Sequence, residues 1–595
     1  MSVLNFLTEA PLISLAVTAL CLAVAAVVVL GGAENFTPVN KLHIDFPPEA
    51  DKSWKDGKIL DNPSIKIPSD PESIQCYDPS TGRSLGVRRA VTPAEIREAV
   101  ARARVAQKEY AKTSFAQRRA FLRTLLDWCV REQDRICAVT GRDSGKTAVD
   151  GSFGEILTTC SKLRWTIQQG EKYLQSEYRG GHSLVTMHKS ARVDYLPLGV
   201  MGCIVSWNYP FHNVIGPLIS ALFAGNACVV KSSEHVAWSS EFFEKAIKAA
   251  LRVNGLNEDL VTIKSGWADA GEALISEADK VTFIGSPGVG KIVMKTASAT
   301  LTPVVLELGG KDAIVAFDDC DVNQLLDVAM RCTFQNSGQN CAGLERIIIQ
   351  EGIYARVVEE LAKRIKAVRV GPPLEEQVDV GAMTMPTQLD IIQRLVDDAV
   401  AKGARLLAGG KRFIHPKFPK GQFYTPTLLA DVTTDMLIAT EEVFGPVLAL
   451  YKFRTEEEAI ALANCCQFGL GGAVFTLDYN KGERIAKHLK TGMCNINDFG
   501  INYLCMSLPF GGVGLSGVDR FSGVEGLRGN CHLRSATTDK FRALGVRTGL
   551  PPPVKFPLTP ASEKFQEGLI GMAFGSGLAD RVQGVKNLIF ASLGW

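Results

Sequence analysis

Four short apolar runs, separated by segments of helical length, restrict the fold of this chain more than any other feature of its sequence. The runs occupy residues 199–205, 227–231, 260–263 and 280–284. Strands that alternate with helices in this way predict an α/β protein with a mostly parallel, doubly wound, Rossmann-like sheet. Ligands of such sheets bind at the carboxyl ends of the strands, so we expect functional residues there.

Length and composition bound the classes of protein to which the chain can belong. With 595 residues it exceeds the size of a single core, and we expect two or three domains. A net charge of +2 supplies no basic surface field, which argues against nucleic-acid binding. The 15 cysteines are scattered and lack paired metal-type spacing. They indicate reduced thiols, no bound metal and a catalytic body that faces the cytosol.

The N-terminus departs from this globular composition. Residues 10–33 contain no charged side chain, and residues 12–30 are nearly all Leu, Val, Ala and Ile. A helix over residues 12–30, at about 1.5 Å per residue, spans roughly the 30 Å hydrocarbon layer. We therefore predict a membrane anchor over residues 1–33 that contacts lipid through residues 12–30. The alternatives are a buried globular helix and a cleaved signal peptide, although no Lys or Arg precedes the run and the run is long for a signal peptide.

Charges that flank the apolar run predict its orientation. Only Glu9 precedes the run, whereas four lysines follow it between residues 41 and 58. By the positive-inside rule, the body of this single-pass membrane protein then faces the cytosol, and we expect the endoplasmic reticulum as its organelle. The glycosylation sequon at Asn35 would stay unmodified in that topology. Residues 34–74, rich in Pro, Asp, Lys and Ser, are predicted to form a linker.

The strongest chemical signal is a cysteine paired with a glutamate. Cys341 lies in a Gly-Gln-Asn-Cys-Ala-Gly run, and Glu307 begins a Glu-Leu-Gly-Gly-Lys run upstream. A thiol can add to an electrophilic carbon, and a carboxylate can deprotonate the thiol or the water that later clears the adduct. Taken singly, the cysteine would be a small buried residue and the glutamate a solvated charge. Their occurrence together with Asn208, in Ser-Trp-Asn-Tyr-Pro, favours covalent catalysis at a carbonyl.

These motifs together resemble those of the aldehyde dehydrogenase superfamily, over residues 75–535 and in the family's order. The overall resemblance is strongest to the membrane-associated branch of plants and fungi with an N-terminal hydrophobic segment. The resemblance implies a Rossmann-like NAD-binding domain, an α/β catalytic domain and a small oligomerisation hairpin, and hence a homodimer or homotetramer. The NAD-binding domain comprises residues 75–178 and 198–309, and the catalytic domain comprises residues 310–519. The oligomerisation elements comprise residues 179–197 and 520–540.

Two predicted strand ends carry residues that fit a dinucleotide. Lys231 and Glu234 follow one strand, and the corresponding residues of the family bind the adenosine ribose. A carboxylate at that place would repel a 2′-phosphate, which favours NAD over NADP as the cofactor.

The second strand end is a glycine-containing loop. Glycines let a backbone approach a pyrophosphate, and the helix that follows offers free amides and the positive end of its dipole. Alone, such a pattern is more often an ordinary turn, but its place after a strand assigns Gly285, Ser286 and Gly290 to cofactor binding. The Pro-Gly pair at residues 287–288 departs from the polar pair that is commoner in the family.

Three further residues are assigned to the cofactor by the resemblance. These are Trp207 beside the asparagine motif, Glu442 for the nicotinamide ribose and Phe444 for packing beside the nicotinamide ring. Taken singly, Glu442 would be a surface charge and Phe444 a core residue. The late motif around Ser516 also matches the family, with a departure at residues 518–519, and we assign it no catalytic role.

The resemblance implies oxidation of an aldehyde to a carboxylic acid. Cys341 would attack the aldehyde carbon, Asn208 and the Cys341 backbone N–H would stabilise the oxyanion, and Glu307 would activate the releasing water. Lys231 is placed with cofactor binding, although the family sometimes draws it into catalysis. Two alternatives are a CoA-acylating or phosphate-dependent enzyme, against which Glu307 argues, and an inactive membrane scaffold, against which the retained residue set argues.

The sequence says least about the substrate and the C-terminus. Membrane attachment favours lipophilic aldehydes, which partition into the bilayer. Side chains at residues 211–212 and 499–503 could line a substrate tunnel or belong to the core. The C-terminal extension, residues 541–595, has apolar residues at near-helical spacing interrupted by glycines. It could lie on the membrane surface or pack on the body.

Overall fold

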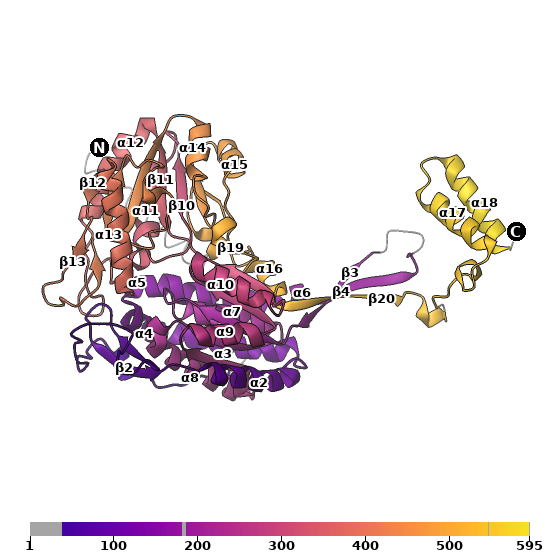
Figure 1. Cartoon of the computed structure of the whole chain (residues 1–595), viewed down its shortest axis with the longest axis horizontal. Helices are drawn as coiled ribbons and strands as arrows, with labels where there is room; N and C mark the ends of the chain where they lie inside the picture. The colour runs from indigo at the N-terminus through magenta and orange to yellow at the C-terminus, as the bar shows by residue number, and fades with distance from the viewer. Residues whose placement is uncertain (1–38, 181–185, 546, 594–595) are drawn as a thin grey trace, which may run out of the picture.

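The computed structural model describes residues 39–180, 186–545 and 547–593. Figure 1 shows two α/β units in contact, and a slender three-stranded sheet that leads away from them to a pair of C-terminal helices. The predicted membrane anchor at residues 12–30 lies outside the described residues. Within the described ranges, no helix is long and apolar enough to cross a bilayer.

The first unit is built on a six-stranded sheet with the strand order β19-β9-β8-β5-β6-β7. Its strands are β5 (Val200–Val205), β6 (Ala227–Ser232), β7 (Val261–Ser265), β8 (Lys280–Ile284), β9 (Val304–Glu307) and β19 (Gly517–Val518). All neighbours are parallel except β19, which runs antiparallel to β9. The four apolar runs predicted as strands form β5 to β8, so the predicted doubly wound sheet is confirmed.

Helices flank this sheet and explain why its strands are almost wholly apolar. They are α2 (Pro93–Tyr110), α3 (Phe115–Arg131), α4 (Gln133–Ser144), α6 (Thr158–Leu174), α7 (His212–Phe223), α8 (Ala237–Val253), α9 (Ala268–Glu277) and α10 (Pro287–Ser298). The start of helix α2 is fixed by local signals in the sequence. Thr92 and Glu95 form a reciprocal capping box, and Pro93 occupies the first turn. A sheet covered on both faces buries every side chain, which selects continuous apolar strands.

The second unit has a seven-stranded sheet with the order β12-β15-β16-β11-β10-β17-β18. Its strands are β12 (Arg405–Ala408), β15 (Thr427–Ala430), β16 (Val447–Phe453), β11 (Leu344–Gln350), β10 (Asp312–Ala316), β17 (Gly472–Phe475) and β18 (Asn495–Ile496). Two apolar clusters lie against this sheet. The helices are α11 (Val322–Phe334), α12 (Glu351–Lys366), α13 (Pro386–Ala401), α14 (Glu456–Ala463) and α15 (Tyr479–Ala486).

Residues 39–74 differ from the predicted linker. Leu42 is buried, and Phe46 packs against the rings of Trp128 and Phe242. The segment ends in the hairpin of β1 (Ser73–Tyr77) and β2 (Ser84–Arg89). These few apolar side chains attach the segment to the first unit. The mostly polar composition of the segment gave no indication of this packing.

The chain connects the two sheets twice. It leaves β9 through Gly309 and enters β10, and it returns when β19 pairs Gly517 with Glu307. Ser516 joins the two passages, because its hydroxyl donates to Gly309 O at 2.6 Å and accepts from Gly469 N at 2.9 Å. Residues 517–518 therefore belong to the first sheet, although they were predicted as part of the second domain.

A third, antiparallel sheet carries the end of the chain. It consists of β3 (Glu177–Arg179), β4 (Lys189–Pro197) and β20 (Cys531–Asp539), in the order β20-β4-β3. The two segments predicted as oligomerisation elements thus meet in one sheet, while their role in assembly stays a prediction. Beyond β20 the chain forms α17 (Pro560–Phe574) and α18 (Leu578–Ser592), which Figure 1 shows set apart from the body.

Gly517→Ala should lower both stability and activity. Gly517 has φ of +142°, and a Cβ there would lie 2.1 Å from Leu306 O, so alanine must separate β19 from the strand that carries Glu307. We expect a loss of about 1–3 kcal/mol in unfolding free energy, measured by thermal or denaturant unfolding. Gly549→Ala is the matched control, since no described atom lies within 4 Å of its added Cβ. Equal stability of the two variants would contradict this account.

Candidate active site

A cavity of about 1010 Å³ opens where the two α/β units meet. Its walls include the carboxyl ends of β5, β6, β8 and β9 and the loops of the second unit. Ten predicted site residues line it: Trp207, Asn208, Lys231, Glu234, Gly285, Ser286, Glu307, Cys341, Glu442 and Phe444. The expected position of the site at the strand ends therefore matches the structure.

Gly290 was predicted to bind the cofactor, but it is not among the residues that line the cavity. It lies in the first turn of α10, where an added Cβ would come within 2.8 Å of the Leu308 side chain. Its missing side chain lets α10 approach the chain that follows β9. Gly290 therefore sets helix packing, while Gly285 and Ser286 face the cavity.

Cys341 is presented by a strained loop. Asn336 and Ser337 have φ of +52° and +57°, a left-handed conformation that costs energy for residues other than glycine. The Asn336 side chain donates to Asn208 O at 2.9 Å, and the Ser337 hydroxyl donates to Gly381 O at 3.1 Å. Gly338 closes the turn, since a Cβ there would lie 2.1 Å from Gly445 O. The surrounding chain thus enforces the conformation that places the thiol.

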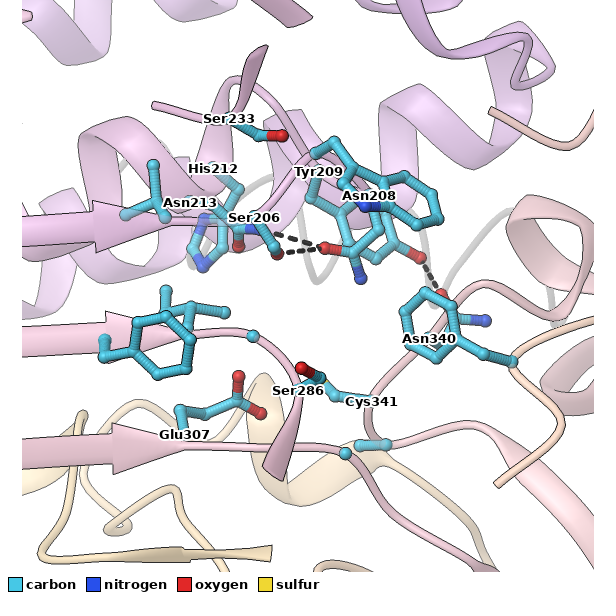
Figure 2. Close-up of a pocket in the computed structure, with 18 of the residues that line it drawn as sticks. Ser206, Asn208, Tyr209, His212, Asn213, Ser233, Ser286, Glu307, Asn340 and Cys341 are labelled. Atoms are coloured by element: carbon cyan, nitrogen blue, oxygen red, sulfur yellow. Dashed lines mark hydrogen bonds between the residues drawn. The ribbon is translucent and has the colours of Figure 1, made fainter. Parts of the chain in front are cut away.

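The Glu307 carboxyl and the Cys341 thiol open into this one cavity, as Figure 2 shows. Burial raises the pKa of Glu307 to about 7, although a hydrogen bond with the Cys341 thiol acts in the opposite direction. Burial, followed by the nearby Glu307 charge, raises the pKa of Cys341 well above its usual value. The resting thiol is therefore protonated at neutral pH, and Glu307 is the adjacent group that can take its proton.

Asn208 is held so that its amide nitrogen faces the cavity. Its Oδ1 accepts hydrogen bonds from the Ser206 hydroxyl at 2.6 Å and the Asn213 amide at 3.0 Å, drawn in Figure 2. These two donors fix which end of the side chain is the oxygen. Nδ2 donates one hydrogen to Gln339 O at 3.0 Å, and its second hydrogen remains for a ligand. A fixed donor of this kind can stabilise an oxyanion.

The end of β6 presents a charged pair at one side of the cavity. Lys231 Nζ lies 3.1 Å from Glu234 Oε2, and both side chains line the cavity. Desolvation is the largest single effect and raises the pKa of Glu234, but the Lys231 charge, a backbone hydrogen bond, the His235 charge and the hydrogen bond from Lys231 together outweigh it, so the pKa is lowered overall. Glu234 is therefore ionised and offers carboxylate oxygens to hydroxyl donors.

The end of β8 offers hydrogen-bond donors for an anion. Ser286 is the N-cap residue of α10, and in the described chain its side chain makes no capping hydrogen bond, so the hydroxyl is not committed to the helix. The first turn also supplies backbone amides and the positive end of the helix dipole. Pro287 at the first position lacks an N–H, which removes one of those donors.

The second unit contributes a carboxyl group and an aromatic ring. Glu442 Oε1 accepts from Gly310 N at 2.9 Å, and a Cβ at Gly309 would overlap the same carboxyl. Phe444 meets Trp207 edge to face, with ring centroids 5.6 Å apart. Across the junction of the two units, Phe444 therefore faces Trp207, and Glu442 contacts the chain at residues 309–310.

A model of the aldehyde dehydrogenase family matches residues 66–535 of the chain. The chain belongs to the aldehyde dehydrogenase family. The predicted resemblance at family level is confirmed, and the protein is an oxidoreductase that acts on aldehyde groups.

Relatives and solved structures agree with this assignment. A putative aldehyde dehydrogenase-like protein of Schizosaccharomyces pombe is 43% identical over 509 residues, covering 85% of this chain and 97% of the relative. A second, from Saccharomyces cerevisiae, is 44% identical over 540 residues, covering 88% and 83%. The crystal structure of a putative aldehyde dehydrogenase from Burkholderia cenocepacia has a TM-score of 0.76 at 29% identity, covering 82% and 96%. That of a Mycobacterium tuberculosis aldehyde dehydrogenase complexed with NAD+ has a TM-score of 0.73 at 28% identity, covering 84% and 97%.

This aldehyde dehydrogenase also contains a buried ion pair behind Asn208 that the motif reading missed. Lys146 Nζ donates to Glu155 at 2.6 Å and to Asn208 O at 2.8 Å, and both side chains are 0% exposed. The other Glu155 oxygen accepts from the backbone N of Phe211 and of His212. The pair therefore ties the Asn208 loop to the start of α7.

Glu155 owes its inward position to an irregular helix. It lies in a π-helical turn, Ser152–Leu157, between α5 (Ala148–Gly151) and α6. Such turns interrupt the ordinary helical phase and occur often at functional sites. A charged residue in a helical sequence is ordinarily read as solvent-facing, so composition and spacing gave no signal for it.

Glu345 is a second residue that the motif reading missed. Its carboxyl accepts from the backbone N of Val443 and of Phe444, each at 2.9 Å, and from Lys311. It thereby shapes the segment that carries Glu442. Glu345 stands between Leu344 and the charged Arg346 at the start of β11, and buried carboxylates are uncommon, so the sequence gave no signal that it turns inward.

The far end of the cavity is mostly aromatic and aliphatic. Tyr503 and Phe499 line it, as does His212, whose ring hydrogen-bonds to Thr159 at 2.9 Å on one side and to Tyr503 on the other. Phe211, in contrast, packs in the core against Trp128 and Phe243. The predicted tunnel residues are therefore divided between the cavity and the core.

Asn208→Ala should reduce kcat by about 100 to 1,000-fold, because it removes a preorganised donor. Steady-state kinetics of aldehyde-dependent NADH formation would measure the loss. Asn213→Ala is the graded control, since it removes only one of the two donors that orient the Asn208 amide. Unchanged kcat in Asn208→Ala, or a larger loss in Asn213→Ala at equal thermal stability, would contradict this role.

Proposed function

We propose that the enzyme oxidises a lipophilic aldehyde to its carboxylic acid at a membrane, using NAD+ and a cysteine-bound thiohemiacetal and thioester. The observation that carries the catalytic part is the shared cavity of Cys341 and Glu307 beside the oriented Asn208 amide. Nucleophile, base and oxyanion donor are the groups that acyl-transfer chemistry at a carbonyl requires.

The first step is proton transfer from Cys341 to Glu307. The thiolate sulfur then bonds to the aldehyde carbon, and the carbonyl electron pair moves onto oxygen. Asn208 Nδ2–H and the backbone N–H of Cys341 stabilise that oxyanion. Burial disfavours the thiolate of Cys341 and the carboxylate of Glu307 alike. Proton transfer from the thiol to the carboxylate therefore replaces one buried anion with another and adds no net charge to the cavity.

The cavity residues fit a nicotinamide dinucleotide. When bound, NAD+ supplies the hydride acceptor that oxidises the thiohemiacetal to the thioester. Lys231 and Glu234 would hold the adenosine ribose, and Ser286 with the first amides of α10 would hold the diphosphate. Glu442 would bond the nicotinamide ribose. The ionised Glu234 supports NAD+ over NADP+, since it would repel a 2′-phosphate.

Release of the acid needs a water and a base. Glu307 Oε1 is buried and lacks a hydrogen-bond partner among the described residues. A buried carboxyl oxygen without a partner is costly, and a water in the cavity would satisfy it. Glu307 first releases to solvent the proton that it received from Cys341. It then takes a proton from this water as the water oxygen bonds to the thioester carbon. The C–S bond breaks to release the carboxylic acid, and Glu307 returns its proton to the sulfur, which re-forms the Cys341 thiol.

Membrane location and lipophilic substrates rest on two supporting observations. The uncharged run at residues 12–30 supports a single-pass anchor, with the endoplasmic reticulum and a cytosol-facing body as the proposed setting. Phe153, Phe499 and Phe510 are among the apolar side chains of the cavity, which suits an aliphatic chain.

The three-stranded sheet supports the proposed homodimer or homotetramer by its likeness to the family's bridging hairpin.

An assay of NADH formation across aldehydes of increasing chain length tests this proposal. We expect kcat/KM to rise with chain length, by about tenfold for every two methylenes buried. Cys341→Ala should abolish NADH formation, and NADP+ should be a poor substitute. A requirement for added CoA would favour the acylating alternative, and inactivity towards every aldehyde would favour the scaffold.

The activity should depend on pH through Glu307. Its carboxylate is the active form, and its pKa is raised to about 7, so kcat should fall as the pH drops below 7 and level off above it. Glu307→Gln should lower kcat by about 100 to 10,000-fold and abolish this acid limb. Initial rates between acidic and mildly alkaline pH provide the measurement. A Glu307→Gln enzyme that keeps the wild-type pH profile would show that another group titrates.

A further inference from the structure

The two C-terminal helices form a hairpin that is separate from the catalytic body. Helices α17 and α18 run for 15 residues each and are joined by a turn of Gly575, Ser576 and Gly577. We call residues 560–592 the C-terminal hairpin. Figure 1 shows it at the far end of the three-stranded sheet, away from both α/β units.

The helices of the C-terminal hairpin contact each other through glycines. An added Cβ at Gly584 would lie 2.2 Å from Met572 N, and one at Gly568 would lie 2.6 Å from Leu588 N. Gly571 faces the same contact, where a Cβ would lie 3.3 Å from Gly584 Cα. The two backbones therefore touch directly, and large apolar side chains are excluded from much of the space between them.

Apolar side chains point outward from the hairpin instead, most of all around its turn. Ile570, Phe574 and Leu578 are 53%, 74% and 81% exposed. The whole stretch from Gly568 to Ala579 contains no charged residue. Helices of this length are marginal in water when they lack an apolar core, so this arrangement needs an apolar surrounding.

The sequence and dimensions of the hairpin favour lipid as that surrounding. Contact through small residues is how helices associate where no hydrophobic effect drives them together, as in a bilayer. Fifteen residues at about 1.5 Å each are shorter than the roughly 30 Å hydrocarbon layer, so the hairpin can enter one face but not cross. Within the hairpin, three Lys and Arg balance three Asp and Glu, but the segment that leads to it, residues 540–559, adds four Lys and Arg and no acidic residue, which suits anionic headgroups.

We propose that the C-terminal hairpin inserts its charge-free turn, residues 568–579, into the surface of an anionic bilayer. This contact is separate from the predicted anchor at residues 12–30, and it does not depend on the proposed dehydrogenase mechanism. The chain would then hold the membrane at both of its ends, with the catalytic body between the two attachments.

Photo-crosslinking of the full chain in phosphatidylcholine–phosphatidylserine vesicles tests the insertion. The photoreactive residue p-benzoylphenylalanine replaces Phe574 in one protein and Tyr479 in the control, an aromatic residue on α15 that is 63% exposed. Because both proteins keep the N-terminal segment, both are equally close to the vesicles. We expect lipid adducts, measured by mass spectrometry, to be at least about tenfold more frequent at residue 574 than at residue 479.

Substitutions at the turn separate insertion from folding. Leu578→Asp places a carboxylate in the first turn of α18, where it favours the helix but opposes burial in lipid. It should remove most lipid adducts at residue 574 while aldehyde-dependent NADH formation persists. Gln566→Asp, at an exposed polar position of α17, should leave the adducts unchanged. Adducts to a second copy of the chain, equal yields at residues 574 and 479, or insensitivity to Leu578→Asp would overturn the proposal.

Discussion

The double passage of the chain between its two sheets is the constraint on which the active site depends. Glu307 ends a strand of the first sheet, whereas Cys341 is carried by a loop that precedes β11 of the second. Nothing in either sheet alone fixes their separation. The Ser516 hydroxyl, bonded to Gly309 O and Gly469 N, and the pairing of Gly517 with Glu307 lock the two units together at this point. The late sequence motif around Ser516, to which we assign no chemical role, therefore positions Glu307 relative to Cys341.

Burial then decides the protonation of the pair. Desolvation keeps the Cys341 thiol protonated at rest and raises the pKa of the Glu307 carboxyl to about 7, so near neutral pH the carboxyl is divided between its neutral and ionised forms. An oxyanion formed when the sulfur adds to a carbonyl would meet an Asn208 amide that Ser206 and Asn213 have already oriented. The polar groups of the site are thus arranged for the transition state rather than for the resting enzyme.

The sequence predicted those parts of the structure that have a local signature. Strands β5 to β8 are continuous apolar runs because both faces are covered, and Cys341, Glu307 and Asn208 lie in short distinctive motifs. It could not reveal the roles of Lys146, Glu155 and Glu345, because each of them, besides its ion-pair partner, bonds to backbone groups distant in sequence. Gly290 was assigned to the cofactor loop, but it lies in the first turn of α10, and only the fold shows the Leu308 side chain behind it. The packing of residues 39–74 was hidden by a polar composition around a few anchoring side chains.

The three-stranded sheet has a mechanical consequence. All nine residues of β20 pair with β4, from Cys531 opposite Pro197 to Asp539 opposite Lys189. A pull on the end of the chain would load these hydrogen bonds in shear, along the strand, so that many must break together. Tension from the C-terminus would therefore be shared with β4 before it passes along the chain towards β19 and Glu307.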